Sequence, residues 1–232
     1  MEILKNVEIK EKALWLKEKR ILIIADLHVG YEQDLLEKGI MVPHYQFKEI
    51  FKEIKELLKL NPKKIIINGD LKHEFGKINK QEWFDIGTLL DFLLKKCEVT
   101  LIKGNHDNFL KPIARKKDLK IEDFVILDDI AILHGHKIFM ECLDKKIKTL
   151  VIGHDHPCVM LKEGLKIEKF KCFLLGRYHK KNLIVQPSFI PFPEGRDMQK
   201  EPLLSPLIKN VGNFEVFIIG DKVYKFGKLK NL

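Results

Sequence analysis

Five short segments of the chain carry the kinds of side chain that bind metal ions. Seven of the nine histidines lie in or beside them. The segments read Asp26-Leu-His28, Gly69-Asp70, Gly104-Asn105-His106-Asp107, Leu133-His134-Gly-His136 and Gly153-His154-Asp-His156. Taken singly, each is typical of a turn or a helix N-cap, because Gly, Asn and Asp favour both. Their combination in one chain indicates a metal site instead.

The types of ligand indicate which ions would bind and which reaction they would support. Carboxylate, amide and imidazole groups without thiolates suit manganese, iron, zinc or nickel, and we favour manganese. Seven candidate ligands are too many for one ion, so we expect two divalent ions that share a carboxylate, roughly 3.5–4 Å apart. Such a pair activates water for in-line attack at phosphorus. We therefore expect a metal-bridging hydroxide that hydrolyses a phosphate ester.

Short apolar runs precede the first three segments and predict the strands that position them. Arg20–Ala25, Lys64–Asn68 and Val99–Lys103 are rich in Ile, Leu and Val, as buried strands are. Between them, Tyr45–Leu60 and Asn79–Lys95 repeat apolar residues at three and four, which predicts amphipathic helices. This order is β-α-β-α-β, and α/β sheets bind ligands at the carboxyl ends of their strands.

After residue 123 the pattern changes to short strands with few helices between them. The predicted strands are Phe124–Leu127, Ala131–Leu133, Thr149–Ile152, Lys166–Leu174, Leu183–Gln186, Glu215–Ile219 and Lys222–Phe226. The proline-bearing stretch Gln186–Leu207 is too apolar for a disordered tail, so we interpret it as a packed surface loop. An α/β half followed by a strand-rich half predicts two packed sheets with helices outside, in one domain over residues 1–232.

Composition restricts the partners and the cellular location only weakly. The 42 basic and 33 acidic residues leave a formal charge of +9, which favours an anionic partner such as nucleic acid, but the lysines are spread along the chain. The four cysteines form no C-x-x-C pair, and we expect buried, reduced thiols. Met1–Trp15 alternates apolar and charged residues, unlike a signal peptide, and no run has transmembrane length. We expect a cytoplasmic protein without a membrane segment.

The five segments, in this order, resemble the calcineurin-like metallophosphoesterase superfamily from Asp26 to His156. The resemblance implies an α/β (α+β) fold, a four-layer α-β-β-α sandwich of two mixed sheets with flanking helices. Two finer features, Asp26-Leu-His-Val-Gly-Tyr-Glu followed by Gly39 and Pro43, and Gly69–Phe75, are similar to the archaeal SbcD-related and DNA-ligase-associated branch.

The resemblance also implies a role for each matching position. The first metal ion would be held by Asp26, His28 and His156, the second by Asn105, His134 and His154, and Asp70 would bridge them. His106 would be the acid that protonates the leaving oxygen. Only one histidine of the Leu-His-Gly-His segment has a place, and we choose His134 because it ends the apolar strand, with His136 as the alternative.

One departure bears on the substrate. Many phosphatases of the superfamily have Asp three residues after the bridging Asp, to orient the catalytic imidazole, and here that position is His73. We count His73 as a catalytic residue, and the partner that orients His106 stays open, with Glu74 and Asp107 as candidates. The change favours a phosphodiester, and nucleic acid is one candidate source. A phosphomonoesterase acting on a small metabolite is the alternative, and a scaffold without chemistry is disfavoured because the ligand set is complete.

The positions of the arginines also favour a phosphodiester substrate. A monoester dianion usually needs arginine around its oxygens, and none of the four lies within the metal-binding segments: Arg20, Arg115, Arg177 and Arg196. Lys72 or Lys103 are the lysines that would contact phosphate instead. The sequence does not indicate an oligomeric state.

Overall fold

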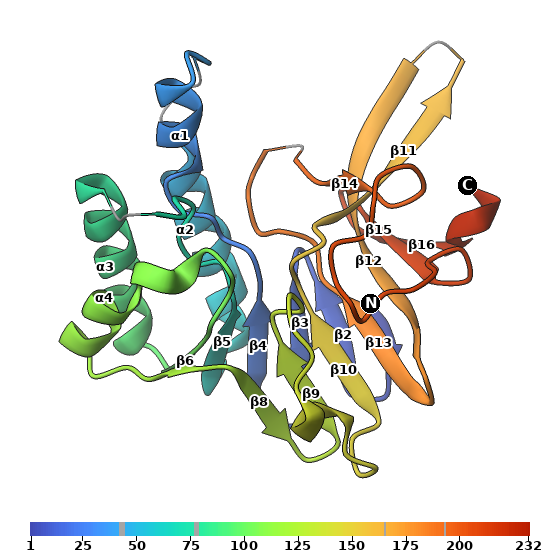
Figure 1. The fold of residues 1–232 in the computed structure, drawn as a ribbon, viewed down its shortest axis with the longest axis horizontal. Coiled ribbons are helices and arrows are strands. Elements are labelled where there is room, and N and C mark those ends of the chain that lie inside the picture. Colours follow the sequence, from blue (N-terminus) through green and yellow to red (C-terminus); the bar gives the residue numbers. More distant parts are fainter. Residues whose placement is uncertain (42–44, 77–78, 165, 193) are drawn as a thin grey trace.

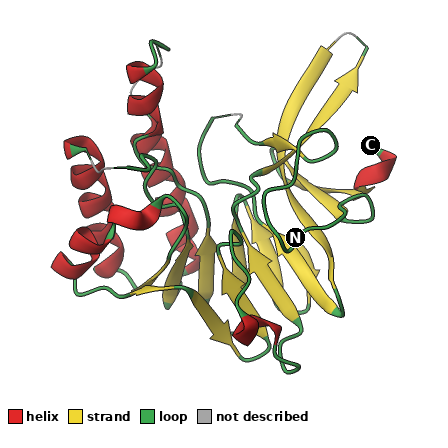
Figure 2. Ribbon diagram, viewed as in Figure 1, coloured by secondary structure: helices red, strands yellow, loops and turns green. Residues whose placement is uncertain are grey.

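A computed structural model describes residues 1–41, 45–76, 79–164, 166–192 and 194–232. Two β-sheets pack face to face, and the α-helices lie against the outer face of the first sheet (Figures 1 and 2). The prediction of two mixed sheets with flanking helices is confirmed. Pro43, one of the residues that carry the finer resemblance, lies outside the described residues.

The first sheet contains the strands that end at the first three metal-binding segments. Its order is β1-β2-β3-β4-β5-β6-β7, antiparallel up to β4 and parallel from there on. The strands are β1 Glu2–Leu4, β2 Val7–Lys10, β3 Ala13–Leu16, β4 Ile21–Ile24, β5 Lys64–Asn68, β6 Glu98–Ile102 and β7 Ile121–Glu122. We predicted β4, β5 and β6 but not β1 to β3. In β2, buried Val7 and Ile9 alternate with polar residues, which is the period-2 signal of a half-buried strand.

The described residues contain four α-helices, which are α1 Tyr31–Glu37, α2 Gln46–Leu57, α3 Lys80–Leu94 and α4 Lys111–Lys116. Apolar side chains of α2, α3 and α4 cover this sheet, whereas α1 adds none to that core. The predicted helix Tyr45–Leu60 is α2 followed by a 3-10 turn, Leu58–Leu60. Helix α3 begins where predicted because the Asn79 side chain accepts the Glu82 N–H while the Glu82 side chain accepts that of Asn79, a capping box.

The second sheet contains the strands of the chain's second half. Its order is β14-β11-β12-β13-β10-β9-β8, and β15, which pairs with β16, joins β12. The strands are β8 Phe124–Leu127, β9 Ile130–Leu133, β10 Thr149–Ile152, β11 Pro157–Glu163, β12 Lys166–Tyr178, β13 Lys181–Val185, β14 Arg196–Asp197, β15 Glu215–Ile219 and β16 Val223–Lys228. Strand β12 continues four residues past its predicted end at Leu174, because residues 174–178 pair with β13. The hairpin β11–β12 projects from the body (Figure 1).

Apolar side chains fill the space between the sheets and on both outer faces. Phe173 and Phe217 of the second sheet pack with Ile23 and Ile66 of the first in the inner core. Among the described residues, 3-10 turns and the segment 198–214, instead of α-helices, cover the outer face of the second sheet. The proline-bearing stretch is packed as predicted: Phe189 is fully buried there.

The cysteines follow the prediction with one exception. Cys142, Cys158 and Cys172 are buried free thiols, whereas Cys97 is only half-buried. Burial raises the pKa of Cys142 to about 11 and that of Cys158 to about 12, so both stay protonated at neutral pH. In the described part of the chain, no helix combines the length and the apolar composition needed to cross a membrane.

Candidate metal centre

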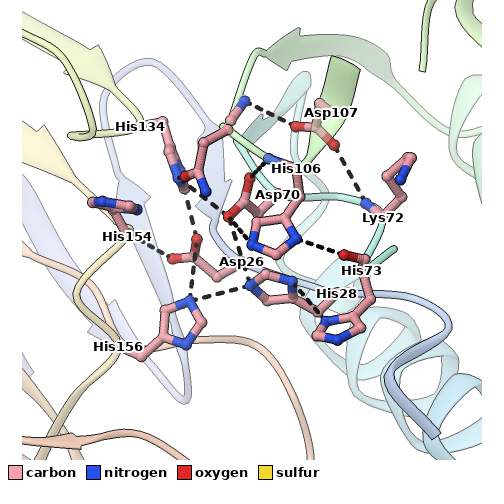
Figure 3. A network of polar contacts seen from close by, with 12 residues as sticks. Asp26, His28, Asp70, Lys72, His73, His106, Asp107, His134, His154 and His156 are labelled. Atoms are coloured by element: carbon pink, nitrogen blue, oxygen red, sulfur yellow. Dashed lines mark hydrogen bonds and ion pairs between the residues drawn. The ribbon is translucent and has the colours of Figure 1, made fainter. Parts of the chain in front are cut away.

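Side chains from the two sheets meet where β4, β5, β6, β9 and β10 end (Figure 3). Asp26 follows β4 of the first sheet, and His134 follows β9 of the second. Their Oδ1 and Nδ1 atoms lie 3.5 Å apart. The site therefore spans the two sheets, and each sheet supplies part of it.

All seven predicted ligands lie in this cluster. The donor atoms of Asp26, His28 and His156 lie within 4.8 Å of one another, and so do those of Asp70, His134 and His154. Asn105 joins the second group through its Oδ1, which lies 3.0 Å from His134 Nε2. His136, the alternative to His134, stands beside that ring with centroids 5.2 Å apart. His134, unlike His136, belongs to a group of three donors that could hold an ion.

The donors fit a divalent cation. Asp26 Oδ1 is buried and has no hydrogen-bond donor among the described residues. The Nε2 atoms of His28 and His156 face each other at 3.2 Å. Two facing ring nitrogens at this distance need a proton or a metal cation between them. Carboxylate, amide and imidazole donors suit manganese, iron or zinc.

The backbone holds five of these residues in the left-handed region. Its φ angle is 55° at Asp26, 44° at His28, 46° at Asp70, 70° at His154 and 45° at His156. A non-glycine residue in such a conformation costs roughly 1–3 kcal/mol and persists only where its surroundings enforce it. Backbone hydrogen bonds enforce these conformations here, since Asp26 N donates to Gly69 O at 3.1 Å and His28 N to Asp70 O at 2.9 Å.

Two glycines of the segments are needed for close approach. A Cβ on Gly69, whose φ is 80°, would overlap the imidazole of His134, and one on Gly104 would overlap the carboxylate of Asp70. Any side chain at either position would push a donor out of the cluster.

A sequence model of the calcineurin-like phosphoesterase family matches residues 19–221. The chain belongs to this family. A nuclease MPE from Pseudomonas putida has a similar structure, with a TM-score of 0.68 and 19% sequence identity over 93% of this chain and 92% of that one. The phosphoesterase YfcE from E. coli is more distant, with a TM-score of 0.44 and 15% identity over 87% and 88%. A comparison with curated proteins finds no match. Metal-dependent hydrolysis of phosphate esters is the chemistry that this family suggests.

In this phosphoesterase, the buried carboxylates and imidazoles neutralise one another. Burial lowers the pKa of His134, but Asp70 and Asp26 outweigh it and raise the pKa to about 9. Burial likewise opposes Asp26 and Glu194 at His156, and the pKa rises to about 10. Both rings are therefore cationic at neutral pH in the metal-free protein. Burial, with His134 nearby, lowers the pKa of His154 to about 3, so this ring is neutral.

His106, the proposed acid, is oriented by the backbone. Its Nδ1–H donates to the carbonyl oxygen of His73 at 2.5 Å, and its own N–H donates to Asp70 Oδ1 at 2.9 Å. The partner that the sequence left open is therefore a backbone carbonyl, and neither candidate, Glu74 or Asp107, bonds to the ring. The Glu74 carboxylate accepts the N–H of Gly76, and that of Asp107 is directed at other backbone groups.

Asp107 connects two loops of the site. Its Oδ1 accepts the N–H groups of Leu71 and Lys72, and its Oδ2 accepts that of Gly104. Lys72 itself is fully buried. It therefore cannot reach a substrate, and our expectation that it contacts phosphate is wrong. Lys103 remains half-buried.

His73 packs against His28, and together with His28 and His106 it forms a third group of donors within 4.8 Å of one another. Its Nδ1 is 3.3 Å from His28 Nδ1, and its Nε2 is 3.3 Å from Asp34 Oδ2. Sequence reasoning missed Asp34, because α1 was not predicted. It also missed Glu194, whose Oε1 lies 2.7 Å from His156 Nδ1, because Glu194 lies in the stretch we interpreted only as a packed loop.

The two cationic imidazoles predict how the stability of the metal-free protein changes with pH. An unfolded histidine titrates near 6.5, whereas His134 and His156 titrate at about 9 and about 10 in the folded chain. Their contribution to the free energy of unfolding is fully present below about pH 6.5 and is lost as the pH rises through these values. Thermal unfolding in excess chelator should therefore show a melting temperature that falls across this window.

Variants separate this effect from the titration of other groups. His156→Gln should lose less stability over the same pH range than the wild type, since one of the two charges is gone. His179→Gln, at an exposed turn, should follow the wild-type curve. Parallel curves for His156→Gln and the wild type would contradict the charge state of His156.

Proposed function

We propose that this protein is a phosphodiesterase that uses two divalent metal ions. The main observation behind this proposal is the position of Asp70 between the two groups of donors. Its Oδ2 lies 3.7 Å from His28 Nε2 and 3.3 Å from His134 Nε2, so one carboxylate reaches both groups of donors. A shared carboxylate is what a two-metal site requires.

The donors divide into two sets around this carboxylate, and manganese is the ion we favour. Asp26, His28 and His156 would hold one ion, Asn105, His134 and His154 the other, and Asp70 both. Bound there, the two cations supply an activated water and neutralise the charge of the phosphate.

His106 would protonate the leaving oxygen. Its Nδ1–H is engaged by the His73 carbonyl, so Nε2 is the atom that carries the exchangeable proton. Its side chain is 25% exposed, so the ring is accessible from solvent while Asp70 Oδ2 lies 3.9 Å from Nε2. Because the backbone holds the ring in place, no reorientation is needed between proton uptake and proton release.

Two observations support a diester over a monoester. The first is that three of the four arginines are engaged by backbone carbonyls: Arg20 donates to Asn61 O, Arg177 to Lys180 O and Arg196 to Pro202 O. Without arginine forks the site is better suited to a phosphate that carries one negative charge than to one that carries two.

The second observation is that aromatic rings flank the imidazoles. Tyr31 lies 4.8 Å from His73 and Phe75 lies 5.1 Å from His106, centroid to centroid. Phe192 extends the first flank, 6.0 Å from Tyr31. Phe75 is 52% exposed. These rings offer stacking surfaces for the organic groups of a diester, and bases of single-stranded nucleic acid stack on such surfaces.

A nucleic-acid diester is therefore the substrate class that we favour, and Gly69–Phe75 supports placing the chain near the SbcD-related branch of the family. The phosphomonoesterase alternative has less support, because no arginine lies within the metal-binding segments and Lys72 is buried, which leaves Lys103 as the candidate cation. The spread lysines would add contacts to a polyanion, and such binding weakens steeply with salt.

The proposal predicts two metal ions per chain and a dependence on Asp70. Calorimetric titration of chelator-treated protein should find two binding events, and chelation should abolish hydrolysis. Asp70→Asn should be the most damaging single change, with a loss in kcat/KM beyond the roughly 10–100-fold typical of outer-sphere changes. Asp91→Asn, on the exposed face of α3, is the control. Full activity after verified metal removal would rule the proposal out.

We expect His106 to contribute to the chemical step, by protonating the leaving group, and not to metal binding. His106→Gln should keep both ions and the melting temperature, and lose roughly 10²- to 10⁴-fold in kcat on esters with poor leaving groups. The loss should shrink for a nitrophenol, which leaves without a proton. An equal loss on both kinds of ester would mean that His106 binds the phosphate instead.

Diesters should be hydrolysed faster than monoesters. Bis(4-nitrophenyl) phosphate and 4-nitrophenyl phosphate, compared at the same Mn²⁺ concentration, measure this through kcat/KM. A clear preference for the monoester would overturn the diesterase and favour the small-metabolite phosphatase.

A separate experiment tests whether the aromatic rings beside the imidazoles stack on the organic groups of the substrate. The thymidine and methyl diesters of 4-nitrophenyl phosphate share a leaving group and differ only in the group available for stacking. Phe192→Ala should reduce the preference for thymidine by roughly 5- to 150-fold, the effect of about 1–3 kcal/mol per stacked base. Phe84→Ala, which removes an exposed ring of α3, should leave the preference unchanged.

A further inference from the structure

The loop that carries Glu194, of which residues 188–192 and 194–195 are described, is attached to both sheets by three lysines. Lys12, which lies between β2 and β3, donates from Nζ to Phe189 O at 3.0 Å. Lys171 of β12 donates to Ser188 O at 3.1 Å and Ile190 O at 2.7 Å. Lys169, also of β12, donates to Gly195 O at 3.0 Å. The side chains of Lys12 and Lys171 are each only 11% exposed, so these are partly desolvated, charge-assisted bonds.

These bonds hold the backbone on both sides of Glu194, and they would persist without its side chain. Both oxygens of the Glu194 carboxylate are engaged. Oε1 accepts from His156 Nδ1 at 2.7 Å, and Oε2 accepts from the Ser188 hydroxyl at 2.7 Å. Lys171 Nζ lies 3.8 Å from Oε2 and donates to the same hydroxyl at 2.6 Å. The carboxylate is therefore oriented by groups that do not belong to the metal centre.

We propose that Glu194 is a positioning residue, which acts on the metal centre through His156. By accepting the Nδ1–H, it leaves Nε2 as the nitrogen that would donate to a metal ion, and Nε2 lies 3.5 Å from Asp26 Oδ1 and 3.2 Å from His28 Nε2. A carboxylate in this place also makes the imidazole a stronger donor. The proposal rests on the proposed function only in requiring that His156 be a ligand.

The histidines of the site differ in this respect. His134 Nδ1 lies 3.2 Å from the Asn68 carbonyl, and Asp26 Oδ1 is farther away at 3.5 Å. The outer nitrogen of His28, Nδ1, lies 3.3 Å from the ring of His73, which stands between it and Asp34. Among the described ligands, His156 is the one with a carboxylate bonded directly to its outer nitrogen. Loss of that charge should therefore affect the set of Asp26, His28 and His156 before the other.

The experiment is the titration of chelator-treated protein with Mn²⁺. Glu194→Gln keeps an oxygen that can accept the Nδ1–H and removes the charge. It should weaken one of the two binding events by roughly 10–100-fold and leave the other unchanged. Ser188→Ala keeps the carboxylate and should cause a smaller loss in the same event. Glu168→Gln, on an exposed part of β12, removes an equal charge and should change neither.

Two further readouts separate positioning from a general structural role. The melting temperature of Glu194→Gln should stay near that of the wild type, because the lysine bonds to the loop are intact. In the Zn²⁺-loaded wild type, ring ¹⁵N spectra should show His156 protonated at Nδ1 and ligated at Nε2, and Glu194→Ala should lose that defined state.

The titration distinguishes a failure of the Glu194 proposal from a failure of the proposed function. If the wild type binds no divalent ion, the proposed function fails. If the wild type binds two ions and Glu194→Gln binds both with unchanged affinity, or weakens both equally with a lowered melting temperature, Glu194 does not position His156.

Discussion

The contact between buried carboxylates of one sheet and imidazoles of the other is the constraint on which the rest of this phosphoesterase depends. Asp26 and Asp70 are inaccessible to solvent, and an isolated buried carboxylate would be too costly to keep ionised. His134, from the facing sheet, lies within 3.5 Å of one and 3.3 Å of the other. The sheets must therefore pack in one relative position, because any other would leave charges unpaired.

This requirement explains the irregular backbone at the strand ends. Residues two apart in a regular strand share a face, so an extended backbone would keep Asp26 and His28 on one side but carry them away from each other along the strand. The left-handed conformations at both positions turn the chain there instead. Such conformations are costly, and the loops compensate with bonds from strand end to strand end. Asp107 belongs to this framework, since it holds the backbone after Asp70 against the backbone before Asn105.

Around the donors lies a layer of groups that orient them, and it comes from parts of the chain that carry no metal-binding segment. Asp34 of α1 reaches His28 through His73, and Glu194 of the lysine-bound loop reaches His156. Local structure is enough to present the donors, but their exact orientation depends on these distant elements. A site built in this way tolerates substitution of its surface lysines more readily than substitution of this second layer.

The sequence by itself determined the strands that end at the site and the polar segments that follow them, because both are local signals and parallel strands share an edge. The choice of seven predicted ligands among those residues came from the resemblance to the family. The sequence also indicated His134 over His136 by the end of an apolar run. Only the tertiary structure decided what lies behind the donors. The partners of His106 and His156 are 33 and 38 residues away, one of them a backbone carbonyl, and neither spacing nor composition records which loop packs against an imidazole. The burial of Lys72 was likewise invisible, since it follows from packing between loops that only meet in the folded chain.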